Sequence, residues 1–260
     1  MKYIFDVGAN DGTDGLAMAI LNKNYFIHAF EPNPYLINKI LKLKKKLEKR
    51  KGIKINNYKI NNFAVSDKTE IKYFYISKND KVSSLYRLSK NFDKTWPGYK
   101  DSMFKTIKKI KTKVINLKNF VKKNNIKIIR YIHIDTQGSD LKVLKGFKTD
   151  INIIQEGKME AAVSKEKAAY MNNHSIKDVK KFFTRSNFVI SKIKKIEHLS
   201  TKKILRNEVD IFFKNKNFKK IEKINTNYNE RYFARLVRNE TYLKDDIFDF
   251  FIKIKNLILN

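Results

Sequence analysis

The segment Asp6-Val7-Gly8-Ala9-Asn10-Asp11-Gly12 directly follows three apolar residues, Tyr3-Ile4-Phe5. A short apolar run before a glycine turn predicts a strand, and the apolar pattern after Gly12 predicts a helix with Thr13 as its N-cap. In open α/β sheets, ligands bind beyond the carboxyl ends of the strands, at turns of this kind. The segment therefore predicts a nucleoside site in which the glycines let the backbone approach the ligand.

The spacing of the glycines separates two nucleoside ligands. Dinucleotide enzymes use G-x-G-x-x-G, because backbone N–H groups and a helix N-terminus must hold a pyrophosphate. Here Gly8 and Gly12 are four residues apart, and the acidic Asp6 leads the turn. This pattern suits a ligand with an amino group and no phosphate, as in S-adenosylmethionine and unlike NAD. The residues expected to bind it are Asp6, Gly8, Ala9, Asn10 and Gly12.

A second predicted strand, residues 25–30, ends at Glu31, 19 residues after Gly12. A carboxylate at this place can accept both hydrogen bonds of a ribose diol, so we expect Glu31 to bind the ribose of the cofactor. A helix should follow, with Asn33 as its N-cap and Pro34 at its first position. Its buried stripe is expected to comprise Leu36, Ile37, Ile40, Leu41 and Leu47.

The chain is strongly basic: it has 57 Lys and Arg residues against 26 Asp and Glu, a formal net charge of +31. Such a charge attracts anionic partners, among them nucleic acid, anionic membranes and acidic glycans. The lysines are nevertheless spread along the whole chain beside many Asn and Ile residues, a bias that AT-rich coding also produces. Charge therefore leaves an anionic partner and a compositional origin both open.

Cysteine is absent, which excludes disulfides, thiolate metal sites and iron–sulfur radical chemistry. The glycine turn occupies the place where a signal peptide has its apolar core, and no run of about 18 apolar residues could form a transmembrane helix. We therefore expect a cytoplasmic protein. A length of 260 residues is consistent with one large domain.

Strand and helix patterns alternate along the chain, as in an α/β fold with a mostly parallel sheet. A third strand is predicted at 58–65, and another at 70–77 should pair antiparallel with it. Residues 78–111, rich in lysine and aromatic residues, are interpreted as an insertion over the site on its substrate side. Further strands are predicted at 113–117, 128–134, 151–161, 188–196 and 208–214, and helices at 117–124, 139–145 and 175–184. The last two strands should form an antiparallel edge.

Residues 216–260 are interpreted as a C-terminal helical extension. The sequence is polar up to Asp245 and then amphipathic, with Ile247, Phe248, Phe251, Ile254, Leu257 and Ile258 on one side. The opposite side mixes Asp and Lys and is not uniformly basic, which disfavours a membrane-surface helix. We expect this helix to pack on the domain or on a second subunit of a homodimer.

Five blocks occur in a characteristic order. They are Asp6 to Gly12, Phe30-Glu31-Pro32-Asn33, Phe63-Ala64-Val65-Ser66-Asp67, Ser83-Ser84-Leu85, and the stretch from Ile134-Asp135-Thr136-Gln137-Gly138 through Gly146. Together they resemble the FkbM family of S-adenosylmethionine-dependent methyltransferases over roughly residues 1–215. This resemblance implies that 1–215 form a class I methyltransferase domain, a Rossmann-like sheet with helices on both faces. It also implies methylation of a hydroxyl on a sugar, a glycan or a related small molecule.

The resemblance further implies roles for individual residues. Asp6, Gly8 and Gly12 would hold the methionine end of the cofactor, and Glu31 would hold its ribose. The turn from Ala64 to Asp67 would lie near the adenine.

Methyl transfer to oxygen needs alignment, together with a base or a metal that exposes the lone pair of the hydroxyl. Asp135 follows the central strand and should face the same crevice as Asp6. It is expected to act as a base, to hold the acceptor hydroxyl, or to bind a divalent metal ion. The other candidate bases are Glu160, which we prefer to Glu156, and His174.

Two more ionisable residues lie near these candidates. Asp140 is expected to interact with the dipole of the helix that it begins. His133 is expected to face away from Asp135 and to be structural.

Other functions remain open at this point. An RNA ribose methyltransferase or a basic nucleic-acid-binding protein would fit the charge, although a non-enzymatic protein leaves the acidic residues at successive strand ends unexplained. Enzymes that methylate a flipped base carry a [DNS]-P-P-[YFW] loop, and here Asp135-Thr136-Gln137-Gly138 occupies that place. An NAD-dependent oxidoreductase lacks the expected glycine spacing.

Overall fold

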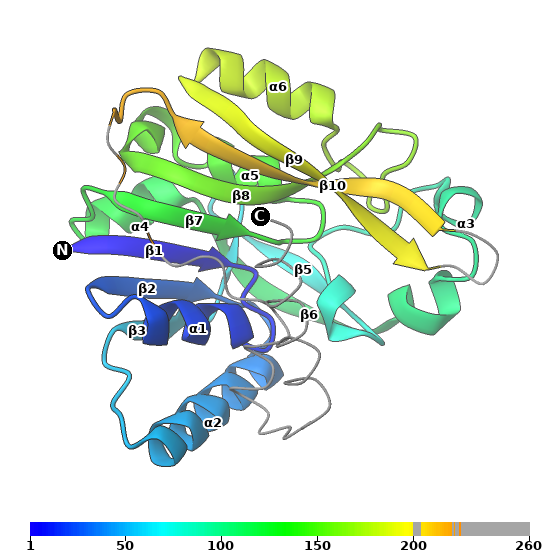
Figure 1. Ribbon diagram of the computed structural model, residues 1–260. Coiled ribbons are helices and arrows are strands. Elements are labelled where there is room, and N and C mark those ends of the chain that lie inside the picture. The colour runs from blue at the N-terminus through cyan, green and yellow to red at the C-terminus, as the bar shows by residue number, and fades with distance from the viewer. Residues whose placement is uncertain (200–203, 220, 222–223, 225–260) are drawn as a thin grey trace, which may run out of the picture. The chain divides into compact units, whose positions relative to one another are not determined.

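A seven-stranded sheet organises the part of the chain that the computed structural model describes, residues 1–199, 204–219, 221 and 224 (Figure 1). In spatial order its strands are β3 (Tyr58–Asn61), β2 (Tyr25–Phe30), β1 (Lys2–Val7), β7 (Ile129–Ile134), β8 (Ile154–Ala162), β10 (Ile204–Asn215) and β9 (Phe188–Leu199). β10 runs antiparallel to both of its neighbours, and the other pairs are parallel. The sequence-based prediction of a mostly parallel sheet with an antiparallel edge is confirmed.

Helices cover both faces of this sheet, as predicted for a class I methyltransferase fold. On one face α4 (Leu117–Lys123), α5 (Asp140–Lys145) and α6 (Ile176–Arg185) pack on the largest hydrophobic cluster, which includes Phe5, Ile132, Ile134 and Phe213. On the other face lie α1 (Thr13–Leu21) and α2 (Pro34–Lys51) (Figure 1). β7 is buried along its whole length, which suits its Ile and Tyr residues, while Arg130 and His133 are buried beside Glu156 and Asp6.

Local signals place the helix starts well. Asn33 accepts a hydrogen bond from the Tyr35 N–H and caps α2, and Ser175 caps α6 through a reciprocal capping box with Asp178. The N-cap of α1 is Gly12 and not Thr13, because Gly12 takes the non-helical backbone conformation while Thr13 is already helical. Of the stripe expected on α2, Leu36, Ile40 and Leu47 are buried, whereas Leu41 is exposed.

A second sheet of three strands, β4 (Ala64–Val65), β6 (Thr106–Ile115) and β5 (Glu70–Ser77), corrects two expectations. The strand predicted at 58–65 divides at Asn62, whose side-chain amide donates to the carbonyls of Glu31 and Pro32 and turns the chain away. β5 pairs with β6, which begins inside the predicted insertion, and not with the third strand. A partner so distant in sequence leaves no local signal.

The remaining part of the insertion forms its own small core. Its short helices are η1 (Asp80–Val82), α3 (Phe92–Thr95) and the π-helical turn Lys100–Phe104, and a further 3-10 helix, η3 (Lys148–Ile153), precedes β8. Phe92 and Trp96 stack with ring centroids 6.2 Å apart, and the indole N–H of Trp96 donates to the Lys167 carbonyl. This core therefore packs against the segment that follows β8. Its predicted role in substrate selection stays a prediction.

None of the helices in the described ranges is long and apolar enough to cross a bilayer. The predicted amphipathic helix after Asp245, and with it the proposed homodimer contact, lies outside the described residues. The predicted boundary between a domain at 1–215 and an extension at 216–260 likewise stays a prediction.

Candidate functional site

The turn between β1 and α1 is fastened to the neighbouring strands by its backbone. The N–H groups of Gly8 and Ala9 both donate to the carbonyl of Phe30 at 3.0 Å. Gly8 has φ +90°, and a Cβ at this position would overlap the carbonyl oxygen of Asp135. A Cβ on Gly12, whose φ is +77°, would lie 2.7 Å from Ile40. These glycines therefore allow the turn to pack on Asp135 and α2, and their contact with a ligand stays a prediction.

Glu31 lies at the carboxyl end of β2 and is fixed by two backbone donors. The N–H of Asn10 donates to Oε2 and the N–H of Asn33 to Oε1, each at 2.9 Å. Glu31 is 4% exposed, and burial raises its pKa to about 8, against the opposing effect of these two hydrogen bonds. Each oxygen of the carboxylate keeps further acceptor capacity. The side chain is thus held at the edge of the turn with its remaining lone pairs available to a ligand.

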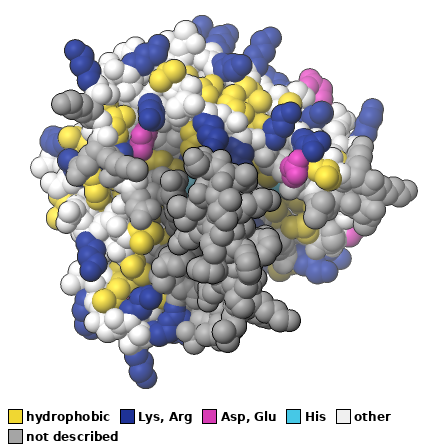
Figure 2. Space-filling model, in the orientation of Figure 1, with side chains coloured by type: hydrophobic (Ala, Val, Ile, Leu, Met, Phe, Trp, Pro, Cys, Tyr) yellow, Lys and Arg dark blue, Asp and Glu magenta, His cyan; other side chains and the backbone are white. Residues whose placement is uncertain are grey.

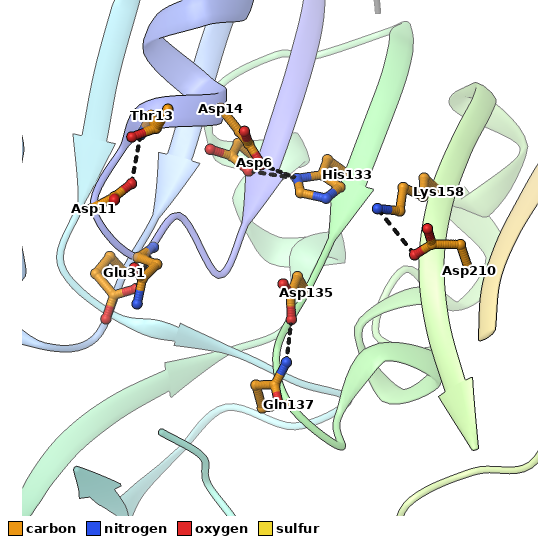
Figure 3. A network of polar contacts seen from close by, with 11 residues as sticks. Asp6, Asp11, Thr13, Asp14, Glu31, His133, Asp135, Gln137, Lys158 and Asp210 are labelled. Atoms are coloured by element: carbon orange, nitrogen blue, oxygen red, sulfur yellow. Dashed lines mark hydrogen bonds and ion pairs between the residues drawn. The ribbon is translucent and has the colours of Figure 1, made fainter. Parts of the chain in front are cut away.

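Asp6 and His133 form a buried pair across β1 and β7 (Figure 3). His133 Nδ1 lies 3.0 Å from Asp6 Oδ1 and 3.9 Å from Asp14 Oδ2. Burial lowers the pKa of His133, but the hydrogen bond and the charge of Asp6 outweigh it, so the pKa lies above its ordinary value. Asp6 Oδ2 is buried without a hydrogen-bond partner in the described part of the chain.

The expectation that His133 faces away from the site was wrong. Side chains two residues apart on a strand point to the same face, so His133 shares the face of Asp135. The correct period would have placed His133 on the face of Asp135 from the sequence alone, whereas its place beside Asp6 follows from the register of β1 and β7.

Asp135 begins a loop that two other segments, those of Ser84 and Tyr170, hold in place. Its Oδ1 accepts from Gln137 Nε2 at 2.7 Å (Figure 3), and the Gln137 Oε1 lies 3.1 Å from the hydroxyl of Tyr170. Ser84 Oγ donates to the Gln137 carbonyl at 2.6 Å. Asp135 itself is partly exposed. The carboxylate is therefore positioned by a supported side chain while remaining accessible to a ligand.

Asp140 lies deeper than Asp135, whereas Glu160 is, like Asp135, partly exposed. Asp140 accepts hydrogen bonds from Thr136 Oγ1 and from the N–H of Glu160, and burial, followed by the charge of Asp135, raises its pKa to about 7. Burial, then the charge of Asp135, also raises the pKa of Glu160 well above its ordinary value. Both shifts leave these groups less ionised at neutral pH than an ordinary carboxylate.

The pairing of β8 with β7 fixes the positions of Glu156 and Gly157. β8 pairs with β7 without a shift, with Gly157 beside Ile132, and Glu156 forms an ion pair with Arg130 at 3.0 Å. Glu160 lies four residues nearer the carboxyl end of β8, and Lys158, between the two, pairs with Asp210 at 3.0 Å.

His174 lies in the segment after β8, where the sequence predicted it. Burial lowers its pKa to about 4, and the charges of Lys145 and Lys142 add to this shift. The imidazole is therefore neutral at pH 7 and weakly basic.

The candidate acids and bases are not arranged as a metal site. The described residues contain no group of three or more His, Cys, Asp or Glu placed to hold an ion. The metal-binding role of Asp135 stays a prediction.

Residues 6–190 match the family model described as the methyltransferase FkbM domain. The chain belongs to the FkbM methyltransferase family. The resemblance stated from the sequence blocks is confirmed. No curated protein matches the chain.

Among solved structures, the chain is similar to an FkbM methyltransferase from Methylobacillus flagellatus KT, with a TM-score of 0.48 and 11% identity over 82% of this chain and 44% of that one. It is also similar to TrmK from M. capricolum in complex with S-adenosyl-homocysteine, with a TM-score of 0.41 and 15% identity over 90% and 67% of the two chains. The chain thus spans less than half the length of the first of these.

In this FkbM domain the turn predicted to lie near the adenine is partly buried. Ala64 belongs to the small core of the insertion, and Asp67 Oδ1 accepts from Ser66 Oγ at 3.2 Å. Asn61 and Asn62 are closer to the ribose-binding candidate, because the N–H of Glu31 donates to the Asn61 carbonyl and the Asn62 amide donates to the Glu31 carbonyl. The contacts of Ala64 and Asp67 with a cofactor stay predictions.

Proposed function

We propose that this FkbM domain is an S-adenosylmethionine-dependent O-methyltransferase that acts on a hydroxyl of a sugar, a glycan or a related small molecule. The observation that carries the proposal is the placement of Glu31, clamped by the backbone of Asn10 and Asn33 at the end of β2, next to the turn that begins at Asp6. A carboxylate so fixed is suited to accept both hydroxyls of a ribose.

Two features of the described residues fit the cofactor. Glu31 has acceptor capacity beyond its two backbone donors, and the buried Asp6 Oδ2 lacks a partner, which is costly unless a donor reaches it. A ribose diol would satisfy the first group, and an ammonium group, directly or through water, would satisfy the second. The residues of the turn therefore match a ligand with a ribose and an amino group.

S-adenosylmethionine supplies, when bound, a methyl group on a good leaving group. The protein must then align an acceptor hydroxyl and remove its proton. Asp135 is suited to this role because it is partly exposed, its backbone lies against the turn at Gly8, and Gln137 orients its carboxylate. We propose oxygen as the acceptor atom. A carboxylate base can take the proton of a hydroxyl group while its oxygen forms the bond to the methyl carbon.

A second candidate acceptor is a ribose hydroxyl of RNA, which the net charge of +31 favours. The two acceptors are separated by incubating the protein with labelled S-adenosylmethionine and either hydroxylated glycans or RNA. Label in a glycan fraction supports the proposal, and label in RNA alone supports the second candidate.

We expect the purified protein to bind S-adenosyl-homocysteine and to bind NAD at least tenfold more weakly. At pH 9, where Glu31 is mostly ionised, the affinity of Glu31→Ala for S-adenosyl-homocysteine should lie about 10- to 100-fold below that of the wild type, because a ribose diol loses a charged acceptor worth roughly 1.5–3 kcal/mol. Glu70→Ala, at an exposed position on β5, is the control for loss of one negative charge. Titration calorimetry measures all three proteins; unchanged affinity in a folded Glu31→Ala protein would place the site elsewhere.

The affinity for adenosine should rise as the pH increases from 7 to 9. With a pKa of about 8 in the free protein, the ionised fraction of Glu31 grows from about one tenth to about nine tenths, so a ribose that needs the ionised carboxylate gains about tenfold in affinity. Adenosine itself does not titrate in this range. Calorimetry at the two pH values tests the expectation, and a flat profile in the wild-type protein would contradict it. Glu31→Ala should show no such rise.

A further inference from the structure

A cationic cavity of about 780 Å³ lies between α5, α6 and the segments at 89–90 and 165–174. Six of its fifteen lining residues are Lys or Arg, compared with 57 of 260 in the whole chain. The cavity is therefore richer in positive charge than this basic protein as a whole, whose Lys and Arg side chains spread over the face seen in Figure 2. The six cations are Lys90, Lys142, Lys145, Lys165, Lys181 and Arg185.

Little negative charge in the described residues offsets these cations. Asp178 is the acid on the lining; it accepts from Ser175 in the capping box of α6 and lies 3.6 Å from Lys165. Lys142 donates to the hydroxyl of Tyr86. Lys145 and Lys181 have no acidic partner in the described part of the chain. The cavity thus holds a surplus of positive charge that a multiply charged anion would neutralise.

The wall of the cavity adds uncharged donors. His174 Nδ1 is buried with no hydrogen-bond partner among the described residues, and the amides of Asn172 and Asn173 also line the space. Tyr170 forms part of the wall and is 2% exposed. Its hydroxyl lies 3.1 Å from Gln137 Oε1, so one side chain separates the cavity from the loop that orients Asp135.

We propose that this cavity binds the phosphates of a small diphosphate-bearing molecule. The cations converge from four separate segments on an open cavity whose volume is within the range of small-ligand sites, whereas a nucleic-acid surface needs a groove that follows a backbone. Lys side chains act as point charges for phosphate oxygens, and the amides and imidazole supply further donors. The inference stands independently of methyl transfer, since binding alone tests it.

The test is titration calorimetry with uridine diphosphate and with inorganic pyrophosphate. We expect both to bind the wild-type protein, and Lys145→Ala/Lys181→Ala to weaken their binding by at least about tenfold, because the double variant removes two of the six cations of the cavity. Lys123→Ala/Lys127→Ala removes the same charge from exposed positions outside the cavity and should change affinity by less than twofold. Affinity for S-adenosyl-homocysteine should be unchanged in both, which separates this result from the cofactor site.

Three results would overturn the proposal. In the first, neither probe binds the wild-type protein. In the second, both double variants lose affinity for the probes equally, which indicates unspecific attraction. In the third, the small probes do not bind, whereas a ten-residue oligouridylate binds the wild-type protein and loses its affinity only in Lys145→Ala/Lys181→Ala. That result assigns the surface to nucleic acid.

Discussion

Asp135→Asn should lower the rate of methyl transfer by roughly 100-fold or more, the usual scale for loss of a positioned base. Affinity for S-adenosyl-homocysteine should stay within a few-fold of the wild type, because Asn keeps an oxygen that can accept from Gln137 Nε2, the contact that orients the side chain. The measurement is single-turnover transfer of a labelled methyl group to an acceptor found by screening. Gln137→Ala, which removes the orienting amide and leaves the carboxylate, should cause a smaller loss.

A chelator distinguishes two roles of Asp135. If the carboxylate acts as a base, the wild-type enzyme is indifferent to chelation, whereas a metal ligand predicts that the chelator reproduces the loss seen in Asp135→Asn. Full activity in Asp135→Asn would reject both roles. Glu160 and His174 would then be the next residues to test; the raised pKa of Glu160 leaves it less ionised at neutral pH, and the pKa of about 4 of His174 makes it a weak base.

Gly8→Ala should destabilise the protein by roughly 2–5 kcal/mol, from overpacking together with backbone strain. The added Cβ would overlap the Asp135 carbonyl oxygen, and the φ of +90° is unfavourable for any side chain. Backbone atoms of β1 and of the loop after β7 cannot move apart without loss of the sheet pairing between them. Urea denaturation measures the change in the free energy of unfolding.

Gly52→Ala is the matched control. Gly52 also has a positive φ, +61°, but a Cβ there meets nothing within 4 Å, so only the strain of about 1–2 kcal/mol applies. A loss that is equal at the two positions would show that the approach of Asp135 to Gly8 is not a tight contact. A cofactor-binding assay on Gly8→Ala alone is uninformative, because the variant disturbs the fold as well as the site.

Features encoded by neighbouring residues could be predicted from the sequence. β1, β2, the turn from Asp6 to Gly12 and the position of Glu31 follow from apolar runs that end in glycine or acidic residues. Parallel strands place their carboxyl ends at one edge, so the acidic residues after β1, β2 and β7 were expected together. The N-caps Asn33 and Ser175 are also encoded by neighbouring residues, because the side chain of an N-cap accepts a hydrogen bond from an N–H group two or three residues away.

Contacts between distant segments were decided only by the tertiary structure. His133 meets Asp6 across 127 residues, Tyr170 supports Gln137, and β5 finds its partner in β6. The neighbour of Gly8 is a backbone carbonyl of another strand, which no local pattern reveals. The cationic cavity likewise collects lysines from four segments. The physical reason is common to all of these: amphipathic patterns determine which face of an element is buried, while the partner on that face depends on how the whole chain packs.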